Sequence, residues 1–239
     1  MCNYLIVSVL VIFAIGYSVE ADFKRVCYYT IRPTNLKVNR INGTLCTHLL
    51  VGFASTVNET LMPFQDNDTV VYKQAVKLKK QYPHLTVMLS VGGGGNDDGF
   101  HAAVASDESR QSFLNSSLDL LETYGFDGLD IDWEFPGWQK HIEDRDKFID
   151  LLHLMYDAFK NRTRQLTLSV AVAPAYTIIK AAYDITEMHK YVDFINLMAY
   201  DFHDYSEIFP FTAYNAPLYR RSSEEGTFEF KKTNVFNIR

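Results

Sequence analysis

Runs rich in apolar and β-branched residues alternate with amphipathic stretches along this chain, and each kind of run predicts a different element. The first kind predicts six strands, over residues 25–30, 48–54, 85–91, 126–136, 165–172 and 193–200. Most of these runs are continuously apolar, as in parallel strands that are buried on both faces. Amphipathic stretches predict helices over 69–80, 106–123, 144–160 and 183–189. This alternation predicts an α/β fold built on a parallel sheet.

The ends of the second helix carry the clearest local signals. Ser106 is a suitable N-cap, because its hydroxyl can accept a hydrogen bond from a free backbone N–H of the first turn. Gly125 is a suitable stop, because glycine adopts the left-handed conformation that ends many helices.

The stretch Phe126–Pro136 is unusual, because it combines strand-forming residues with acids. Asp127, Asp130, Asp132 and Glu134 place four carboxylates within eight residues. Alternate side chains of a strand share a face, so the last three acids lie on one face, about 6.6–7 Å apart, and the apolar residues between them lie on the other. Like charges this close do not all ionise at low cost, so we expect at least one proton to remain near neutral pH. A retained proton is what a general acid requires.

A calcium site and a solvated acidic face are the alternatives for this stretch. Calcium loops also alternate acids, but they need a loop with Gly at the sixth position rather than Ile131 and Trp133 between the acids. A solvated face rarely lies behind Leu129, Ile131 and Trp133. We therefore favour a catalytic site, where clustered carboxylates with perturbed pKa values are common.

The same stretch resembles the hallmark Asp-x-x-Asp-x-Asp-x-Glu of the family 18 glycoside hydrolases, the chitinases and their lectin-like relatives. The segments 90–93, 198–201 and 215–219 resemble further motifs of that family. The resemblance implies a (β/α)8 TIM barrel and hydrolysis of β-1,4-linked N-acetylglucosamine polymers. The chain supplies about six βα units. We therefore expect an incomplete barrel that lacks strands seven and eight, in a chain that looks C-terminally truncated.

The resemblance also implies roles for individual residues. Glu134 is expected to protonate the glycosidic oxygen, while Asp132 turns towards it and holds the acetamido nitrogen of the substrate. The acetamido oxygen then attacks the anomeric carbon, which is the substrate-assisted exception among retaining glycosidases. Asp130 is expected to share a proton with Asp132, Tyr200 to bond the acetamido carbonyl, and Asp127 to be structural. The positions expected to bind or support the substrate are Tyr28, Phe53, Ser90, Gly93, Gly94, Met198 and Asp201.

Aromatic positions depart from the family pattern. Gly94 stands where many relatives carry a tryptophan, so an aromatic face for a sugar is missing. The family tryptophan that ends strand eight lies in the part that this chain lacks. Trp133 faces away from the acids and is expected in the core. Trp138, in the loop after Pro136, fits a rim platform and plain surface equally well.

The N-terminus predicts export. Residues 5–15 are apolar apart from Ser8, a run of about 11 residues that is too short to cross a bilayer. Gly16, Ser18 and Ala21 follow, so we expect a secretory signal peptide over 1–21 and the truncated chitinase-like domain over 22–239. An uncleaved anchor is the alternative.

The cysteines and the sequons agree with an oxidising, extracellular location. Loss of the signal would remove Cys2 and leave Cys27 and Cys46, an even pair as expected of a disulfide, with two free thiols as the alternative. The candidate glycosylation sites are five Asn-x-Ser/Thr sequons, at Asn42, Asn58, Asn67, Asn115 and Asn161. We expect a secreted glycoprotein.

Composition excludes several other classes. The chain has a formal net charge of −6 and 47% hydrophobic residues, which is ordinary for a globular protein and lacks the basic footprint of a nucleic-acid binder. Its seven histidines lack metal-ligand spacing, and the glycine run 92–95 lacks the Gly-Lys-Ser/Thr ending of a phosphate loop. We therefore expect no metal and no cofactor. The expected partner is chitin or a chitooligosaccharide, with no nucleic acid, no membrane after signal cleavage, and a monomeric state.

Three functional hypotheses remain. The intact set Asp130, Asp132, Glu134 and Tyr200 favours a secreted chitinase. A catalytically impaired, chitin-binding lectin of the same family is the second, although such relatives usually lack the acid that Glu134 supplies here. An inactive partial product of a chitinase gene is the third, because an open parallel sheet leaves its two edge strands unpaired.

Overall fold

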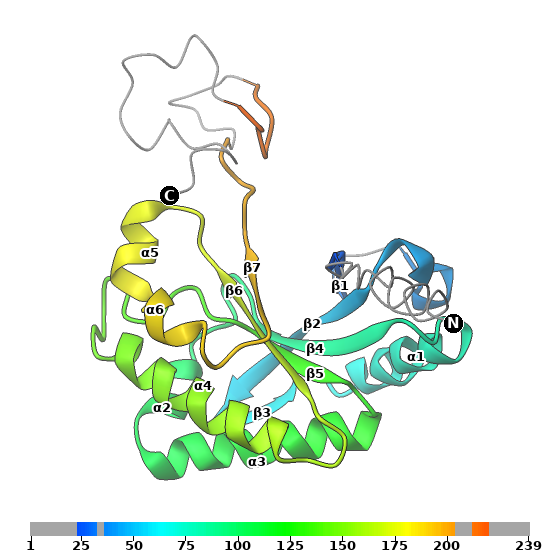
Figure 1. The fold of residues 1–239 in the computed structure, drawn as a ribbon, viewed down its shortest axis with the longest axis horizontal. Coiled ribbons are helices and arrows are strands. Elements are labelled where there is room, and N and C mark those ends of the chain that lie inside the picture. The colour runs from blue at the N-terminus through cyan, green and yellow to red at the C-terminus, as the bar shows by residue number, and fades with distance from the viewer. Residues whose placement is uncertain (1–22, 33–35, 204–211, 220–239) are drawn as a thin grey trace, which may run out of the picture.

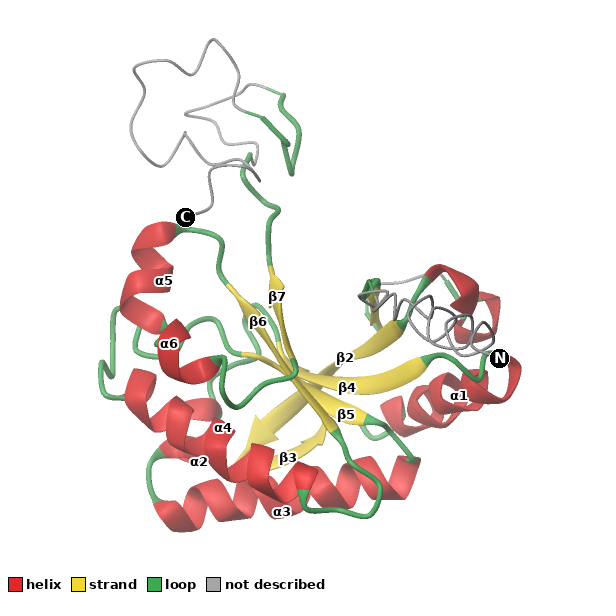
Figure 2. Cartoon of the chain, viewed as in Figure 1, coloured by secondary structure: helices red, strands yellow, loops and turns green. Residues whose placement is uncertain are grey.

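The protein is a curled, mainly parallel sheet with helices along its outer side (Figures 1 and 2). This computed structural model describes residues 23–32, 36–203 and 212–219. The parallel strands follow the order β1-β2-β4-β5-β6-β7, and β3 pairs antiparallel with β2. The strands are β1 (Val26–Thr30), β2 (His48–Val57), β3 (Thr60–Pro63), β4 (Thr86–Gly92), β5 (Gly128–Asp132), β6 (Thr167–Val172) and β7 (Phe194–Leu197). The predicted α/β fold, an incomplete TIM barrel, is therefore confirmed.

Two short 3₁₀ helices, η2 (Val38–Arg40) and η3 (Gly43–Leu45), lie between β1 and β2, and α-helices connect the later parallel strands, so that the sheet grows by one strand with each step along the chain. The helices are α1 (Asp68–Gln81), α2 (Phe100–Val104), α3 (Asp107–Tyr124), α4 (Asp144–Lys160), α5 (Tyr176–Ala182) and α6 (Ile185–Met188). The side chain of Ser106 accepts a hydrogen bond at the start of α3, and Gly125 ends it in the left-handed conformation with a φ of 80°. Both predicted helix signals are confirmed.

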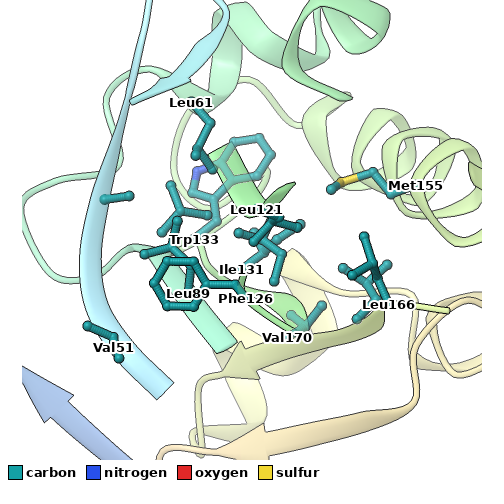
Figure 3. Packing of buried hydrophobic residues seen from close by; sticks show 14 of the residues in the cluster. Val51, Leu61, Leu89, Leu121, Phe126, Ile131, Trp133, Met155, Leu166 and Val170 are labelled. Carbon is teal, nitrogen blue, oxygen red and sulfur yellow. The ribbon is translucent and has the colours of Figure 1, made fainter. Parts of the chain in front are cut away.

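The main core lies between the sheet and this outer layer of helices. Odd-numbered positions of the central strands, such as Leu89 and Ile131, pack against apolar residues of α3 and α4 such as Leu121 and Met155 (Figure 3). Trp133 belongs to the same cluster and stacks on Phe100, with ring centroids 5.2 Å apart. The prediction that Trp133 is a core residue is therefore confirmed. Trp138 is half-buried and packs against this core as well.

On β4 and β5 the even-numbered positions face the concave side of the sheet, and on β6 the odd-numbered positions do, because Ser169 pairs with Asp130. Register pairs Leu50 with Met88, Ser90 with Asp130, and Asp130 with Ser169 across four neighbouring strands. The concave face is therefore apolar towards the start of the strands and polar towards their ends. The predicted separation of the acids from the apolar residues of β5 onto opposite faces is confirmed for Asp130 and Asp132.

The acidic strand is shorter than the sequence predicts. The predicted strand 126–136 narrows to Gly128–Asp132, because β4 turns away at Gly92, which pairs with Asp132. Gly92 has a φ of 98°, a conformation that only glycine adopts easily. Glu134 therefore follows the strand by two residues instead of closing it. Likewise β7 ends at Leu197, which pairs with Val172 at the end of β6. Tyr200 and Asp201 therefore lie in the loop beyond β7 and not at its end.

Among the β-strands and α-helices, three are absent from the sequence prediction: β3, α2 and α5. The hairpin of β2 and β3 turns at Asn58 and Glu59, which both have positive φ, at 46° and 64°. Glycine is the usual second residue of such a turn, so an Asn-Glu pair carries a weak signal. Helices α2 and α5 are only five and seven residues long, too short for a periodic pattern to stand out.

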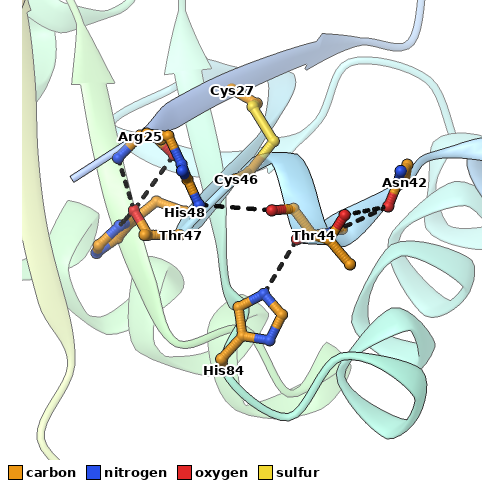
Figure 4. The surroundings of a disulfide bond; sticks show 9 residues. Arg25, Cys27, Asn42, Thr44, Cys46, Thr47, His48 and His84 are labelled. Carbon is orange, nitrogen blue, oxygen red and sulfur yellow. Dashed lines mark hydrogen bonds between the residues drawn. A yellow bond between two sulfur atoms is a disulfide. The ribbon is translucent and has the colours of Figure 1, made fainter. Parts of the chain in front are cut away.

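The disulfide predicted between Cys27 and Cys46 is formed, with the two Cα atoms 5.9 Å apart (Figure 4). It links β1 to the segment that leads into β2. Arg25 and Thr47 add hydrogen bonds at the same place, including one of 2.8 Å from the Arg25 backbone to the Thr47 hydroxyl. The start of the first two strands is therefore closed covalently.

The predicted signal peptide over 1–21 lies outside the described residues. Within the part of the chain that the structure describes, none of the helices is both long enough and apolar enough to cross a membrane.

Candidate active site

Asp130 lies at the centre of the concave face and accepts four hydrogen bonds. It is fully buried, and its partners come from four different strands. The donors are the Tyr28 hydroxyl at 2.8 Å, the Ser90 hydroxyl at 2.7 Å, the Ser169 hydroxyl at 2.6 Å and the Asn196 amide at 3.0 Å. Burial raises the pKa of Asp130, whereas the donated hydrogen bonds oppose that increase. Since all four groups donate to it, the arrangement suits a carboxylate.

Asp132 lies on the same face one step further along β5 and has a different environment. Its side chain is only 4% exposed, and no described residue hydrogen-bonds its Oδ1 atom. Burial raises its pKa to about 8, with further contributions from the negative charges of Glu134, Asp130 and Asp97. Asp132 therefore holds a proton near neutral pH and keeps one oxygen free for a ligand.

Glu134 is half-buried beyond the end of β5. Burial raises the pKa of its carboxyl group, and the charges of Asp97 and Asp201 raise it further. A hydrogen bond from the backbone of Gly94 acts in the opposite direction. A carboxylic acid with a raised pKa at the rim of a cleft can donate a proton to a bound molecule.

A pocket of about 270 Å³ opens directly beside Glu134. Its lining is mainly apolar and aromatic, with two acids, and comprises Glu134, Phe135, Pro174, Ala175, Met198, Tyr200, Asp201 and Phe202. Burial and the nearby carboxylates raise the pKa of Tyr200 to about 12, so its hydroxyl remains a hydrogen-bond donor. A larger pocket of about 680 Å³ lies between β1 and α1 but holds no carboxylate, so it has no comparable chemistry.

Asp201 is held at the rim by a second loop. Asn215 donates a hydrogen bond of 2.7 Å from its amide to the Asp201 carboxylate, and its own side-chain oxygen accepts one of 3.3 Å from the Asp201 backbone. Asp201 has a φ of 56°, which is uncommon for a residue other than glycine. Asn215, the first residue of the segment 215–219 that the sequence singles out, therefore holds this edge of the pocket through Asp201.

Asp127 lies at the other end of the sheet. It accepts hydrogen bonds from Lys79 at 2.7 Å, Arg164 at 3.1 Å and the backbone of Val87 at 2.9 Å. These contacts connect the starts of β4 and β5 to α1 and to the loop before β6. Asp127 is thus far along the strand from the pocket, in keeping with a structural part.

The remaining predicted positions lie around the rim. Phe53 follows a non-proline cis peptide bond in β2, and its ring lies against the backbone of Gly93, where a Cβ atom would be 3.3 Å away. Gly94 approaches the carboxylate of Glu134, since a Cβ atom there would lie 3.5 Å from Oε1.

The five sequons lie away from this pocket. Asn58 is exposed at the tip of the β2–β3 hairpin, whereas the Asn42 side chain accepts hydrogen bonds from both the backbone and the hydroxyl of Thr44. Asn67 precedes α1, Asn115 lies within α3, and Asn161 ends α4.

Sequence reasoning missed Ser169, Asn196 and Asp97. Ser169 and Asn196 are polar residues inside otherwise apolar strand runs, and that interruption is the signal that could have found them. Asp97 lies in the loop after the glycine run, where nothing local indicates its effect on Glu134. No cluster of metal-ligating side chains is found among the described residues.

Comparison with known proteins agrees with this geometry. The profile of "Glycosyl hydrolases family 18" matches residues 24–236. The chain belongs to this family. It is 36% identical to mouse (Mus musculus) chitotriosidase-1 over 216 residues, which are 85% of this chain and 46% of that protein.

Solved structures of family 18 members have the same fold. The Ostrinia furnacalis Group IV chitinase superposes with a TM-score of 0.81 at 32% identity, over 91% of this chain and 61% of that one. Human YKL-39, described as a pseudo-chitinase with retained chitooligosaccharide binding, superposes with a TM-score of 0.77 at 30% identity, over 90% of this chain and 60% of that one. The chain thus spans about half of the mouse relative and three fifths of the two solved structures. The family contains both hydrolases and proteins that bind without turnover.

Proposed function

We propose that this family 18 chain is the catalytic part of a secreted chitinase, which hydrolyses β-1,4-N-acetylglucosamine linkages. The reaction retains the configuration of the anomeric carbon, and the acetamido group of the substrate takes part in it. The observation that carries the proposal is the pairing of a half-buried Glu134 of raised pKa with Asp132, whose Oδ1 atom has no partner among the described residues. The formed disulfide between Cys27 and Cys46 supports secretion, because structural disulfides persist in oxidising compartments.

The proposed reaction begins with proton transfer. Glu134 donates its proton to the glycosidic oxygen, and the bond between that oxygen and the anomeric carbon breaks. Asp132 orients the acetamido group of the sugar through the N–H, so that the acetamido oxygen forms the new bond to the anomeric carbon and an oxazolinium ion results. Water then attacks the same carbon and gives its proton to Glu134, so the configuration is retained and the acid is regenerated. Proton transfer of this kind contributes typically 10²–10⁴-fold to the rate.

The other groups keep the charges in place. Asp130 accepts four hydrogen bonds, and its negative charge is one of the causes that raise the pKa of Asp132. Tyr200 lines the pocket, and its hydroxyl would bond the acetamido carbonyl. The apolar surfaces of Met198 and Phe202 are available to pack against a sugar ring.

Hydrolysis of a fluorogenic N-acetylchitooligosaccharide by the secreted chain tests this proposal. We expect turnover from the parent protein and a loss of at least about 10²-fold in Glu134→Gln. Glu122→Gln is the matched control, because Glu122 forms an exposed ion pair with Arg162, away from the pocket residues, and should leave turnover unchanged.

The same measurement distinguishes binding from catalysis. Soluble, compact protein that binds N-acetylchitooligosaccharides without turning them over would contradict the enzyme and favour the chitin-binding, lectin-like alternative. Turnover that survives Glu134→Gln unchanged would remove Glu134 from the role of acid. Protein that neither binds nor hydrolyses would leave the chain as an inactive partial product.

A further inference from the structure

The loop 93–97 passes beside Glu134, and at Gly94 and Gly95 it presents backbone without side chains to the space there. A Cβ atom on Gly94 would lie 3.5 Å from the Glu134 carboxylate, and a Cβ atom on Gly95 would have no neighbour within 4 Å. An incoming sugar next to Glu134 therefore meets no side chain from these two positions. The first side chains that follow are those of Asn96 and Asp97.

Asn96 fixes the position of this loop. Its amide nitrogen donates hydrogen bonds of 2.9 Å to the backbone oxygens of both Ala54 and Gly92, and its side-chain oxygen accepts one from the Ser55 hydroxyl. The Asn96 backbone N–H also donates to Gly93, at 2.9 Å. Asp97 comes directly after this clamp, and its carbonyl oxygen accepts a 3.1 Å hydrogen bond from Phe100 at the start of α2. The backbone of Asp97 is therefore fixed by the hydrogen bonds of Asn96 before it and by the hydrogen bond from Phe100 after it.

Asp97 adds a further acid to the group around Glu134. Its charge acts on both Glu134 and Asp132, while Asp201 acts on Glu134 from the opposite loop. Over the described ranges, the ion pairs of lysine and arginine all involve other acids, such as Asp127, Asp68 and Asp193. Asp97, Asp132, Glu134 and Asp201 thus interact electrostatically, and none of these four acids has a lysine or arginine partner among the described residues.

Asp132 provides an independent sign that this cleft receives a polar ligand. Its side chain is 96% buried, and its Oδ1 atom lacks a hydrogen-bond partner among the described residues. A buried polar atom without a partner is costly, so a ligand group is expected to fill that place when the site is occupied.

We propose that Asp97 is a specificity-determining residue, which favours oligosaccharides that carry a cationic, deacetylated glucosamine unit beside the N-acetylated sugar at Glu134. This inference rests on the proposed function for the position of the substrate. The substrate-assisted reaction needs an acetamido group on the sugar whose bond is cleaved, so the cationic unit occupies a neighbouring position. There its ammonium group meets the Asp97 carboxylate across the space that Gly94 and Gly95 leave open.

Equilibrium binding to the full chain tests the inference without requiring turnover. The probes are N-acetylchitotetraose and a chitotetraose with one deacetylated unit, measured at a pH where the amine is protonated. We expect the deacetylated probe to bind more tightly at low salt, and Asp97→Asn to weaken its binding by about two- to fivefold, as for other partly exposed charge pairs. Binding of the fully acetylated probe should stay the same, and high salt should reduce the difference.

Two further variants separate charge from structure. Asp98→Asn makes the same chemical change at the neighbouring residue, which is exposed and is not among the charges that raise the pKa of Glu134. This variant should retain the preference for the deacetylated probe. Asp97→Glu keeps the charge and should retain the preference as well, even if Asp97→Asn alters the loop. Equal affinity of the parent for both probes, binding of neither, or an equal loss for both in Asp97→Asn would overturn the inference. A retained preference without any turnover would instead support it and contradict the proposed hydrolysis.

Discussion

Asp130 and Asp132 are two residues apart on one face of β5, yet one accepts four hydrogen bonds and the other leaves an oxygen without a partner. Burial is nearly complete at both positions. The difference arises from the neighbouring strands. Ser90 and Ser169 pair with Asp130 and donate hydrogen bonds to it, whereas Gly92, which pairs with Asp132, has no side chain to donate one. Burial raises the pKa of both acids, and at Asp130 the donated hydrogen bonds oppose that increase.

The raised pKa of Asp132 makes stability depend on pH. Its pKa rises from 3.8 to about 8 on folding, so the folded state keeps a proton that the unfolded chain releases. That stabilisation is complete below about pH 4 and is lost as the pH rises towards 8. We expect the free energy of unfolding, measured by urea denaturation, to fall by on the order of 3 kcal/mol between about pH 5 and about pH 8.

Asp132→Asn should flatten this dependence, because an amide does not titrate. Asp119→Asn, an exposed acid on α3, should leave the slope of the parent unchanged. Parallel stability curves for Asp132→Asn and the parent would show that the proton resides elsewhere.

Asp130→Asn should destabilise the fold. An amide group turns donors towards some of the hydroxyls that now donate to the carboxylate, so buried groups lose partners at a cost of about 2–3 kcal/mol. Ser169→Ala removes only one of the four donors and should cost about 1 kcal/mol. Thermal and urea unfolding measure both, and an equal loss in the two variants would argue against Asp130 as the centre of the network.

Gly94→Trp should increase affinity for chitooligosaccharides. Gly94 is exposed, its Cβ position is in ordinary contact with Glu134, and a ring there would add an apolar face for a sugar. We expect the dissociation constant for N-acetylchitotetraose to fall by about three- to tenfold, as measured by calorimetry. Gly94→Ala adds a Cβ atom without a ring and is the control. An unchanged dissociation constant in Gly94→Trp would place the bound sugars elsewhere.

Loss of the disulfide should destabilise the start of the sheet. Cys27 and Cys46 are 19 residues apart, and a cross-link of this length restricts the unfolded chain by about 3 kcal/mol in the chain-entropy description. The double variant Cys27→Ser/Cys46→Ser should lose roughly this amount in urea denaturation. A reductant should destabilise the parent similarly and leave the double variant unaffected. Insensitivity of the parent to reductant would show that the bond contributes little.

Local pattern was sufficient for the six parallel strands, the long helices and the faces on which their side chains lie. The apolar period of α4 predicted its bounds, and Ser106 and Gly125 marked the ends of α3. The alternation within β5 placed Asp130 and Asp132 on one face and Trp133 in the core. Each of these features depends only on residues that are close together in the sequence, because the periods of helices and strands fix which side chains share a face.

The tertiary structure alone decided what the acids contact. Tyr28 reaches Asp130 across 102 residues and Ser169 across 39, and both contacts depend on strand register and on the curvature of the sheet. The end of β5 at Asp132 depends on where its neighbour β4 turns away, and the effect of Asp97 on Glu134 depends on the Asn96 clamp. The sequence by itself thus determined which carboxylates are available to this site. Pairing between distant strands determined which hydrogen-bond partners each acid has and which acid faces the pocket, because the neighbours that set the pKa of a buried acid are brought together only by folding.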